Sequence, residues 1–66
     1  MWRIIYHNTG TLDYKFSTRQ EAKDYLDEMV AEVTQGAIEF HYVDFPSMTD
    51  IVRNGEVIGA IVYVQN

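Results

Sequence analysis

The sequence predicts an α+β fold: one antiparallel sheet of four to five strands with one amphipathic helix packed on one face, in the order β-β-α-β-β-β. Three observations lead to this class. Apolar residues alternate at a period of two over the first 16 residues, they recur at helical spacing in the middle of the chain, and an Asn54-Gly55 pair marks a tight hairpin. The 66 residues suffice for one small domain, residues 1–66.

The first two strands are expected to form a hairpin. In the first segment, every second position is aromatic or β-branched, at Trp2, Ile4 and Tyr6. The second segment repeats this alternation at Leu12, Tyr14 and Phe16. Between them, Asn8-Thr9-Gly10 has the composition of a turn, in which Gly10 can adopt a positive φ without steric cost.

A helix is predicted from Thr18 to about Gln35. Thr18-Arg19-Gln20-Glu21 fits a capping box, and Ser17 through Gln20 fits the same pattern one residue earlier. Six apolar residues then fall on one stripe at 3.6 residues per turn: Ala22, Tyr25, Leu26, Met29, Val30 and Val33. Gly36 stands where a left-handed C-terminal cap is favoured.

A third strand is predicted from Ala37 to about Phe45. One of its faces would carry Ile38, Phe40 and Tyr42, and the other Glu39 and His41. Pro46 would end this strand because proline lacks the N–H that a sheet needs. The segment from Phe45 to Asp50 is expected to be a loop.

The last two strands are expected to form a hairpin around Asn54-Gly55, the strongest short hairpin signal in a sequence. A two-residue turn at this site predicts three cross-strand pairs: Arg53 with Glu56, Val52 with Val57, and Ile51 with Ile58. The first pair joins opposite charges, which supports this register.

The final strand is apolar on both sides, although one helix of about 18 residues can cover only one face of a sheet. One side carries Ile58, Ala60, Val62 and Val64, and the other carries Val57, Gly59, Ile61 and Tyr63. The strand could be central in a curled sheet, or its exposed apolar residues could be scattered. The favoured interpretation is an exposed sheet face that binds a partner or a second copy through Val57, Ile61 and Tyr63, so we expect a homo-oligomer, by default a dimer.

The predicted helix also carries a row of acidic residues, in a chain of net charge −5. Four of them lie within an arc of about 80°, away from the apolar stripe, and a fifth flanks them: Glu21, Asp24, Glu28 and Glu32, with Asp27 beside them. Lys23 is expected to offset Asp27 only. The row is either a solvated face or a surface that docks into a basic groove of another protein.

The residue types exclude most catalytic and metal chemistry. Cysteine is absent, which removes disulfides, thiolate zinc sites and thiol nucleophiles. His7 and His41 lack a second ligand at metal-binding spacing, and the four glycines form no phosphate loop. We therefore expect no catalytic residue, no cofactor and no metal, and hence no enzyme.

The excess of acidic residues argues against direct binding to nucleic acid or to an anionic membrane. No basic segment followed by an apolar run begins the sequence, so no secretory signal is predicted, and a cytoplasmic location is expected.

No motif identifies a family. In its small size, its acidity and its lack of catalytic motifs, the chain resembles the small inhibitor proteins of bacteriophages and mobile elements, anti-CRISPR proteins among them. That likeness implies a non-enzymatic binder that blocks a basic groove of a nucleic-acid-handling protein in the host cytoplasm. The alternative is a homo-oligomeric structural or accessory domain whose acidic helix is only solvated.

Overall fold

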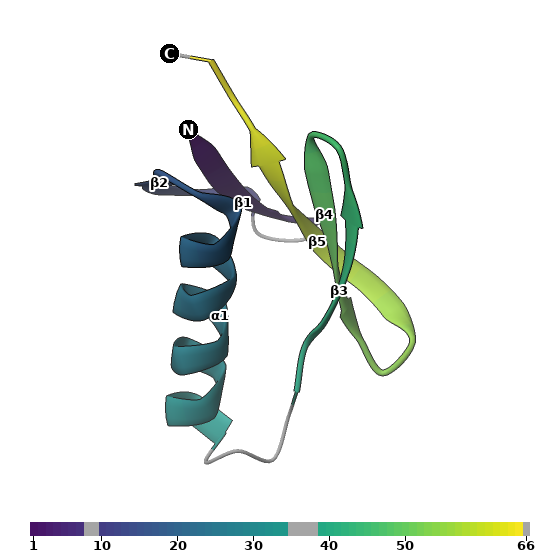
Figure 1. Cartoon of the computed structure of the whole chain (residues 1–66). Helices are drawn as coiled ribbons and strands as arrows, with labels where there is room; N and C mark the ends of the chain where they lie inside the picture. The colour runs from purple at the N-terminus through teal and green to yellow at the C-terminus, as the bar shows by residue number, and fades with distance from the viewer. Residues whose placement is uncertain (8–9, 35–38, 66) are drawn as a thin grey trace.

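The computed structural model describes residues 1–7, 10–34 and 39–65, and it confirms the predicted fold class (Figure 1). Five antiparallel strands form one sheet, and α1 packs on one of its faces. The elements are β1 (Trp2–Tyr6), β2 (Gly10–Phe16), α1 (Arg19–Thr34), β3 (His41–Phe45), β4 (Met48–Arg53) and β5 (Glu56–Tyr63). Their order across the sheet is β2-β1-β5-β4-β3, so the last strand of the chain is the central strand.

The first hairpin pairs Trp2 with Phe16 and Ile5 with Thr11, and its register shifts between Arg3 and Ile5. The glycine of the predicted turn, Gly10, is the first residue of β2. The other two residues of that turn, 8 and 9, lie outside the described residues, as does the side chain of Leu12.

Helix α1 begins where the capping box predicts. The Glu21 N–H donates a hydrogen bond of 3.1 Å to Thr18 Oγ1, so Thr18 is the residue that caps the helix. Ala22 and Leu26 on the apolar stripe are completely buried. The predicted end at Gln35 and the cap at Gly36 lie outside the described residues, and so does the side chain of Val33.

Two predictions around the third strand are wrong. β3 begins at His41 rather than near Ala37; Glu39 and Phe40 precede it, and residues 37–38 are not described. The segment predicted as a loop is mostly strand, because Pro46 and Ser47 form a short turn and β4 starts at Met48. Thr49 explains the difference, since this fully buried polar residue is held in the strand by pairing with Ile61 of β5.

The hairpin of β4 and β5 contains a β-bulge that the sequence did not predict. Asn54 and Gly55 have φ of 53° and 78°, as expected for a tight two-residue turn, and the pairs Arg53–Glu56 and Val52–Val57 are confirmed. Ile51, however, pairs with Gly59 instead of Ile58, so Ile58 is an extra residue in β5.

The bulge changes which residues of β5 lie beneath the helix. Ile61 pairs with Ile4 on the helix side, and both are completely buried, so the prediction that Ile61 lies on the exposed face is wrong. Tyr63 shares that side and is half exposed beside the ring of Trp2. Val57 lies on the opposite side, because it pairs directly with Val52, which alternates with buried Ile51. Without the extra residue, Val57 and Ile61 would face the same way.

Candidate functional site

The side of the sheet away from α1 is rich in apolar side chains, and no described element covers it (Figure 1). We call this surface the open face. By register and alternation, twelve of the residues whose side chains are described lie on it: Arg3, Ile5, Lys15, His41, Val43, Phe45, Met48, Asp50, Val52, Val57, Ala60 and Val62. Eight of the twelve are apolar, which is unusual for a sheet face that meets water.

Four large apolar side chains of the open face are well exposed. The exposed fractions are 47% for Val43, 44% for Phe45, 36% for Met48 and 41% for Val57. Three of them belong to the β3–β4 hairpin, where β3 is an edge strand. The open face is therefore most apolar toward that edge.

The residues of the open face form rows across the sheet. Arg3 of β1 stands beside Val62 of β5, which in turn pairs with Met48 of β4 and then with Phe45 of β3. The neighbouring row contains Ile5, Ala60, Asp50 and Val43 in the same strand order. One basic residue thus lies on β1 and one acidic residue on β4, on either side of the central strand.

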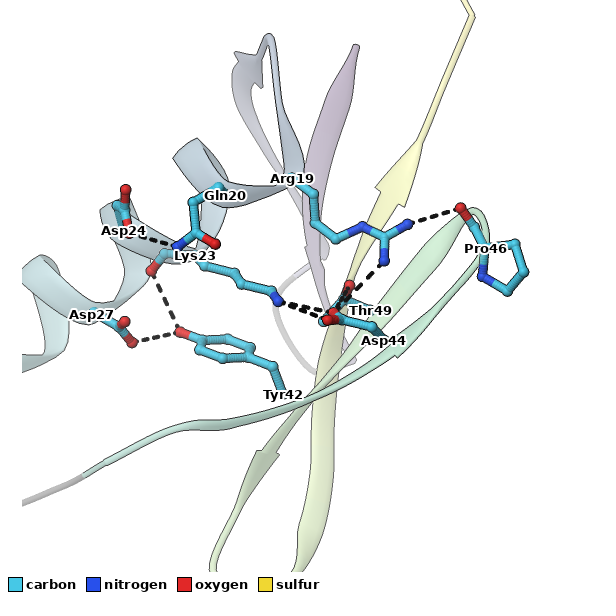
Figure 2. A network of polar contacts seen from close by, with 9 residues as sticks. All are labelled: Arg19, Gln20, Lys23, Asp24, Asp27, Tyr42, Asp44, Pro46 and Thr49. Atoms are coloured by element: carbon cyan, nitrogen blue, oxygen red, sulfur yellow. Dashed lines mark hydrogen bonds and ion pairs between the residues drawn. The ribbon is translucent and has the colours of Figure 1, made fainter.

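On the helix side, Asp44 of β3 joins the β3–β4 hairpin to the first turns of α1 (Figure 2). Lys23 Nζ lies 2.9 Å from Asp44 Oδ1, and Arg19 lies at 3.7 Å from the same oxygen. The buried hydroxyl of Thr49 donates a 2.7 Å hydrogen bond to Asp44. Arg19 also donates to the carbonyl oxygen of Pro46 at 2.8 Å. These contacts hold the hairpin against the helix.

The hydrogen bond from Lys23, followed by that from Thr49, lowers the pKa of Asp44 below its ordinary value. The pairing of Lys23 with Asp44 differs from the sequence prediction, in which Lys23 offset Asp27 only. Asp27 instead accepts a 2.7 Å hydrogen bond from the hydroxyl of Tyr42 on β3. Burial, followed by this hydrogen bond, raises the pKa of Tyr42.

The acidic residues predicted as a partner surface separate into two groups. Asp27 contacts the sheet through Tyr42, and Asp24 accepts a 2.9 Å hydrogen bond from Gln20 within the helix. The remaining three side chains are exposed and form no ion pair with the described part of the chain: Glu21, Glu28 and Glu32.

The two histidines are far from forming a metal site. His7 and His41 are both exposed, at the end of β1 and in β3. Among residues 1–7, 10–34 and 39–65, no three His, Asp or Glu side chains are grouped to hold a metal ion. None of the described helices has the length and apolar character needed to cross a membrane.

Replacing Asp44 by asparagine is expected to lower the melting temperature at neutral pH, because both cations lose their carboxylate. The folded-state pKa of Asp44 lies below its ordinary value of 3.8, so its contribution is present above that value and is lost as pH falls through the folded-state pKa. The difference in melting temperature between wild type and Asp44→Asn should therefore shrink and disappear as the pH falls below about 4. Thermal melts from neutral to acidic pH, monitored by circular dichroism, measure it.

Glu28→Gln is the matched control, because it removes one carboxylate charge from an exposed position that joins no other described element. A gap between wild type and Asp44→Asn that stays constant down to about pH 2 would contradict the role given to Asp44.

Sequence reasoning missed the residues that dominate both surfaces, namely Val43, Phe45 and Met48 on the open face and Asp44 on the helix side. A signal was present in the segment from His41 to Phe45. His41, Val43 and Phe45 lie on one side of this strand, and Tyr42 and Asp44 lie on the other. Each side carries both an aromatic and a polar residue, so the pattern assigns neither side to the solvent.

Comparison with protein-family models, with curated proteins and with solved structures gave no match to this chain. The described side chains and their arrangement are therefore what supports a function.

Proposed function

We propose that this chain is a non-enzymatic protein-binding domain and that the open face is its contact surface. The observation that supports the proposal is the uncovered sheet face, on which Val43, Phe45, Met48 and Val57 are exposed. Soluble monomers seldom keep contiguous apolar patches above a few hundred Å² in contact with water, and larger patches usually mark interaction sites. This surface replaces the set Val57, Ile61 and Tyr63, of which only Val57 lies on the open face.

The shape of the open face also favours a protein ligand. A sheet face presents a broad surface, and such surfaces pack well against another sheet or a helix. The mixture of an apolar centre with a few charged residues, Arg3, Lys15 and Asp50, resembles the composition of protein interfaces. The proposed partner therefore has its own apolar surface.

Photo-crosslinking tests this proposal. A photoreactive benzoylphenylalanine in place of Phe45 should give defined protein adducts in the cells that make the chain, since this ring would lie within the interface. The same group at Tyr14 is the matched control, because Tyr14 is 59% exposed but contacts Tyr25 on the helix side. Adducts should be identified by mass spectrometry, and those to a second copy of the chain count as protein binding.

The adducts from position 45 should be lost when Val43→Lys is added, because a charge then enters the apolar contact. Equal labelling from positions 45 and 14, or labelling that Val43→Lys leaves unchanged, would contradict the proposal.

A second candidate is that the acidic helix face binds a basic protein surface, such as a groove that holds nucleic-acid phosphates. The observation in its favour is that Glu21, Glu28 and Glu32 are exposed without an ion pair among the described residues. Complementary charge speeds association and weakens as salt rises.

For this candidate, the photoreactive group should replace Glu28. Adducts to basic proteins are expected to disappear in the double variant Glu21→Lys, Glu32→Lys, and in about 1 M salt, where the screening length is about 3 Å. Adducts that survive both changes would show that the acidic row does not direct binding.

A further inference from the structure

We infer that the open face is covered by a second copy of this chain, in a two-fold symmetric dimer whose axis runs nearly parallel to β5. The inference rests on the proposed protein-binding function of the open face and names its partner. It follows from the position of one carboxylate, from the order of the strands and from the size of the surface.

The carboxylate is that of Asp50, which stands within the apolar part of the open face. Its cross-strand neighbours are Val43 on β3 and Ala60 on β5. The Asp50 carboxylate takes part in no hydrogen bond or ion pair with the described part of the chain. Covering it with a purely apolar surface would leave a buried, unpaired charge, which is very costly. The partner must therefore bring a cation to this position.

A second copy brings that cation if the two sheets pack face to face about an axis along β5. In the order β2-β1-β5-β4-β3, strands β1 and β4 flank the centre symmetrically. Rotation by 180° about an axis along β5 therefore places β1 of one copy over β4 of the other. Arg3 on β1 then lies over Met48 of β4, one row from Asp50, and the symmetry generates the same arrangement a second time.

The spacing along the strands permits an ion pair between Arg3 and Asp50. Arg3 lies in the row of Val62 and Met48, and Asp50 lies in the adjacent row with Ala60. Adjacent rows on one face are about 7 Å apart, which an arginine side chain can span. The axis itself would pass by Ala60 and Val62, so the centre of the interface would be apolar.

The other face-to-face arrangement is unfavourable. An axis perpendicular to the strands would place each strand over its own copy, so that Arg3 on β1 would not face Asp50 on β4. With that axis at the row of Asp50, the two Asp50 carboxylates would approach each other in an apolar setting. Like charges placed opposite each other in an interface cost several kcal/mol. The arrangement along β5 is therefore selected by charge.

The area of the open face reaches the size needed for a specific interface between two copies. Five strands about 4.8 Å apart span about 24 Å, and strands of five to eight residues are about 17–27 Å long. Each copy thus offers about 500 Å², and a pair buries about 1,000 Å² or more, which is the lower limit for a specific interface. Among the described side chains, five apolar ones are fully buried in one copy, so a second apolar layer would add greatly to a small core.

Analytical ultracentrifugation across a concentration series tests the dimer. Wild type should sediment at twice the 7.7 kDa mass of the chain at high concentration. Arg3→Asp and Asp50→Arg should each weaken self-association about 100-fold or more, because each places two pairs of like charges in the interface. An equimolar mixture of the two variants should restore the dimer, since the mixed dimer contains one native Arg3–Asp50 pair and one pair of reversed sign.

Circular dichroism must show that each variant is folded before it is compared. Phe45→Lys, at an exposed edge position, provides a second variant that should also give a monomer. A wild-type chain that stays monomeric at millimolar concentration, or a dimer that neither charge reversal weakens, would overturn the inference.

The outcome also separates the dimer from the proposed function. A monomeric wild type whose position 45 still crosslinks to a different protein would reject the second copy and retain protein binding by the open face. A monomer without such adducts would reject both.

Discussion

Gly59→Ala is expected to lower the free energy of unfolding by about 3 kcal/mol, because an added methyl group forces two backbones apart. Gly59 of β5 pairs with Tyr6 of β1 at the centre of the sheet. A Cβ at this position would overlap the carbonyl oxygen of Ile5 and would lie 3.2 Å from the Cα of Tyr6. Since both obstacles are backbone atoms, no side chain can rotate to make room.

The stability of a chain of 66 residues is about 3–10 kcal/mol, so this change would consume a large part of it. Urea unfolding of the purified variant measures the loss. Gly55→Ala is the matched control: at Gly55 the surroundings are open, but φ is 78°, so a smaller cost of about 1 kcal/mol is expected from backbone strain alone. Equal losses at the two glycines would contradict the close approach of β1 and β5.

Ile61→Ala is expected to cost about 3–4 kcal/mol, whereas Val62→Ala, at the next residue, should cost about 1 kcal/mol or less. Ile61 is completely buried under α1, in contact with the core of Ile4, Leu26 and Ile51. Val62 lies half-buried on the open face. Comparing these two alanine variants therefore tests which side of β5 meets the helix.

Both variants should be unfolded with urea at low protein concentration, so that self-association does not add to the measured stability. A greater loss for Val62→Ala than for Ile61→Ala would show that the two faces had been assigned the wrong way round. Val62→Ala should instead weaken the dimer proposed above.

The polar contacts around Asp44 explain how a short hairpin is kept against a helix that belongs to a different part of the chain. Lys23 and Arg19 reach across from α1, while Thr49 fixes the same carboxylate from β4. An aromatic ring adds to this attachment, since Lys23 Nζ lies 5.5 Å from the ring centre of Tyr42 on β3. The helix side of the sheet is thus closed by both apolar and charged contacts, in contrast to the open face.

The local patterns in the sequence determined the fold class, the helix with its Thr18 cap, and the tight turn at Asn54-Gly55. Each of these depends on residues close together in the chain, such as a capping hydroxyl three positions from an N–H or two residues with positive φ. The alternation in β1 likewise groups Ile4 with Trp2 and Tyr6 on one side of the strand, and in the structure Ile4 is completely buried. Local chemistry suffices where the interacting groups are neighbours in sequence.

Only the tertiary structure decided which face of β5 is buried. The extra residue Ile58 reverses the alternation between Val57 and Ile61, and a bulge of this kind arises from pairing with β4, which local sequence does not specify. Pairing with β5 also turned the segment after Pro46 into strand. The packing of α1 on the sheet joined Lys23 to Asp44, 21 residues away. These features depend on contacts between distant segments, so they become determined only when the chain has folded.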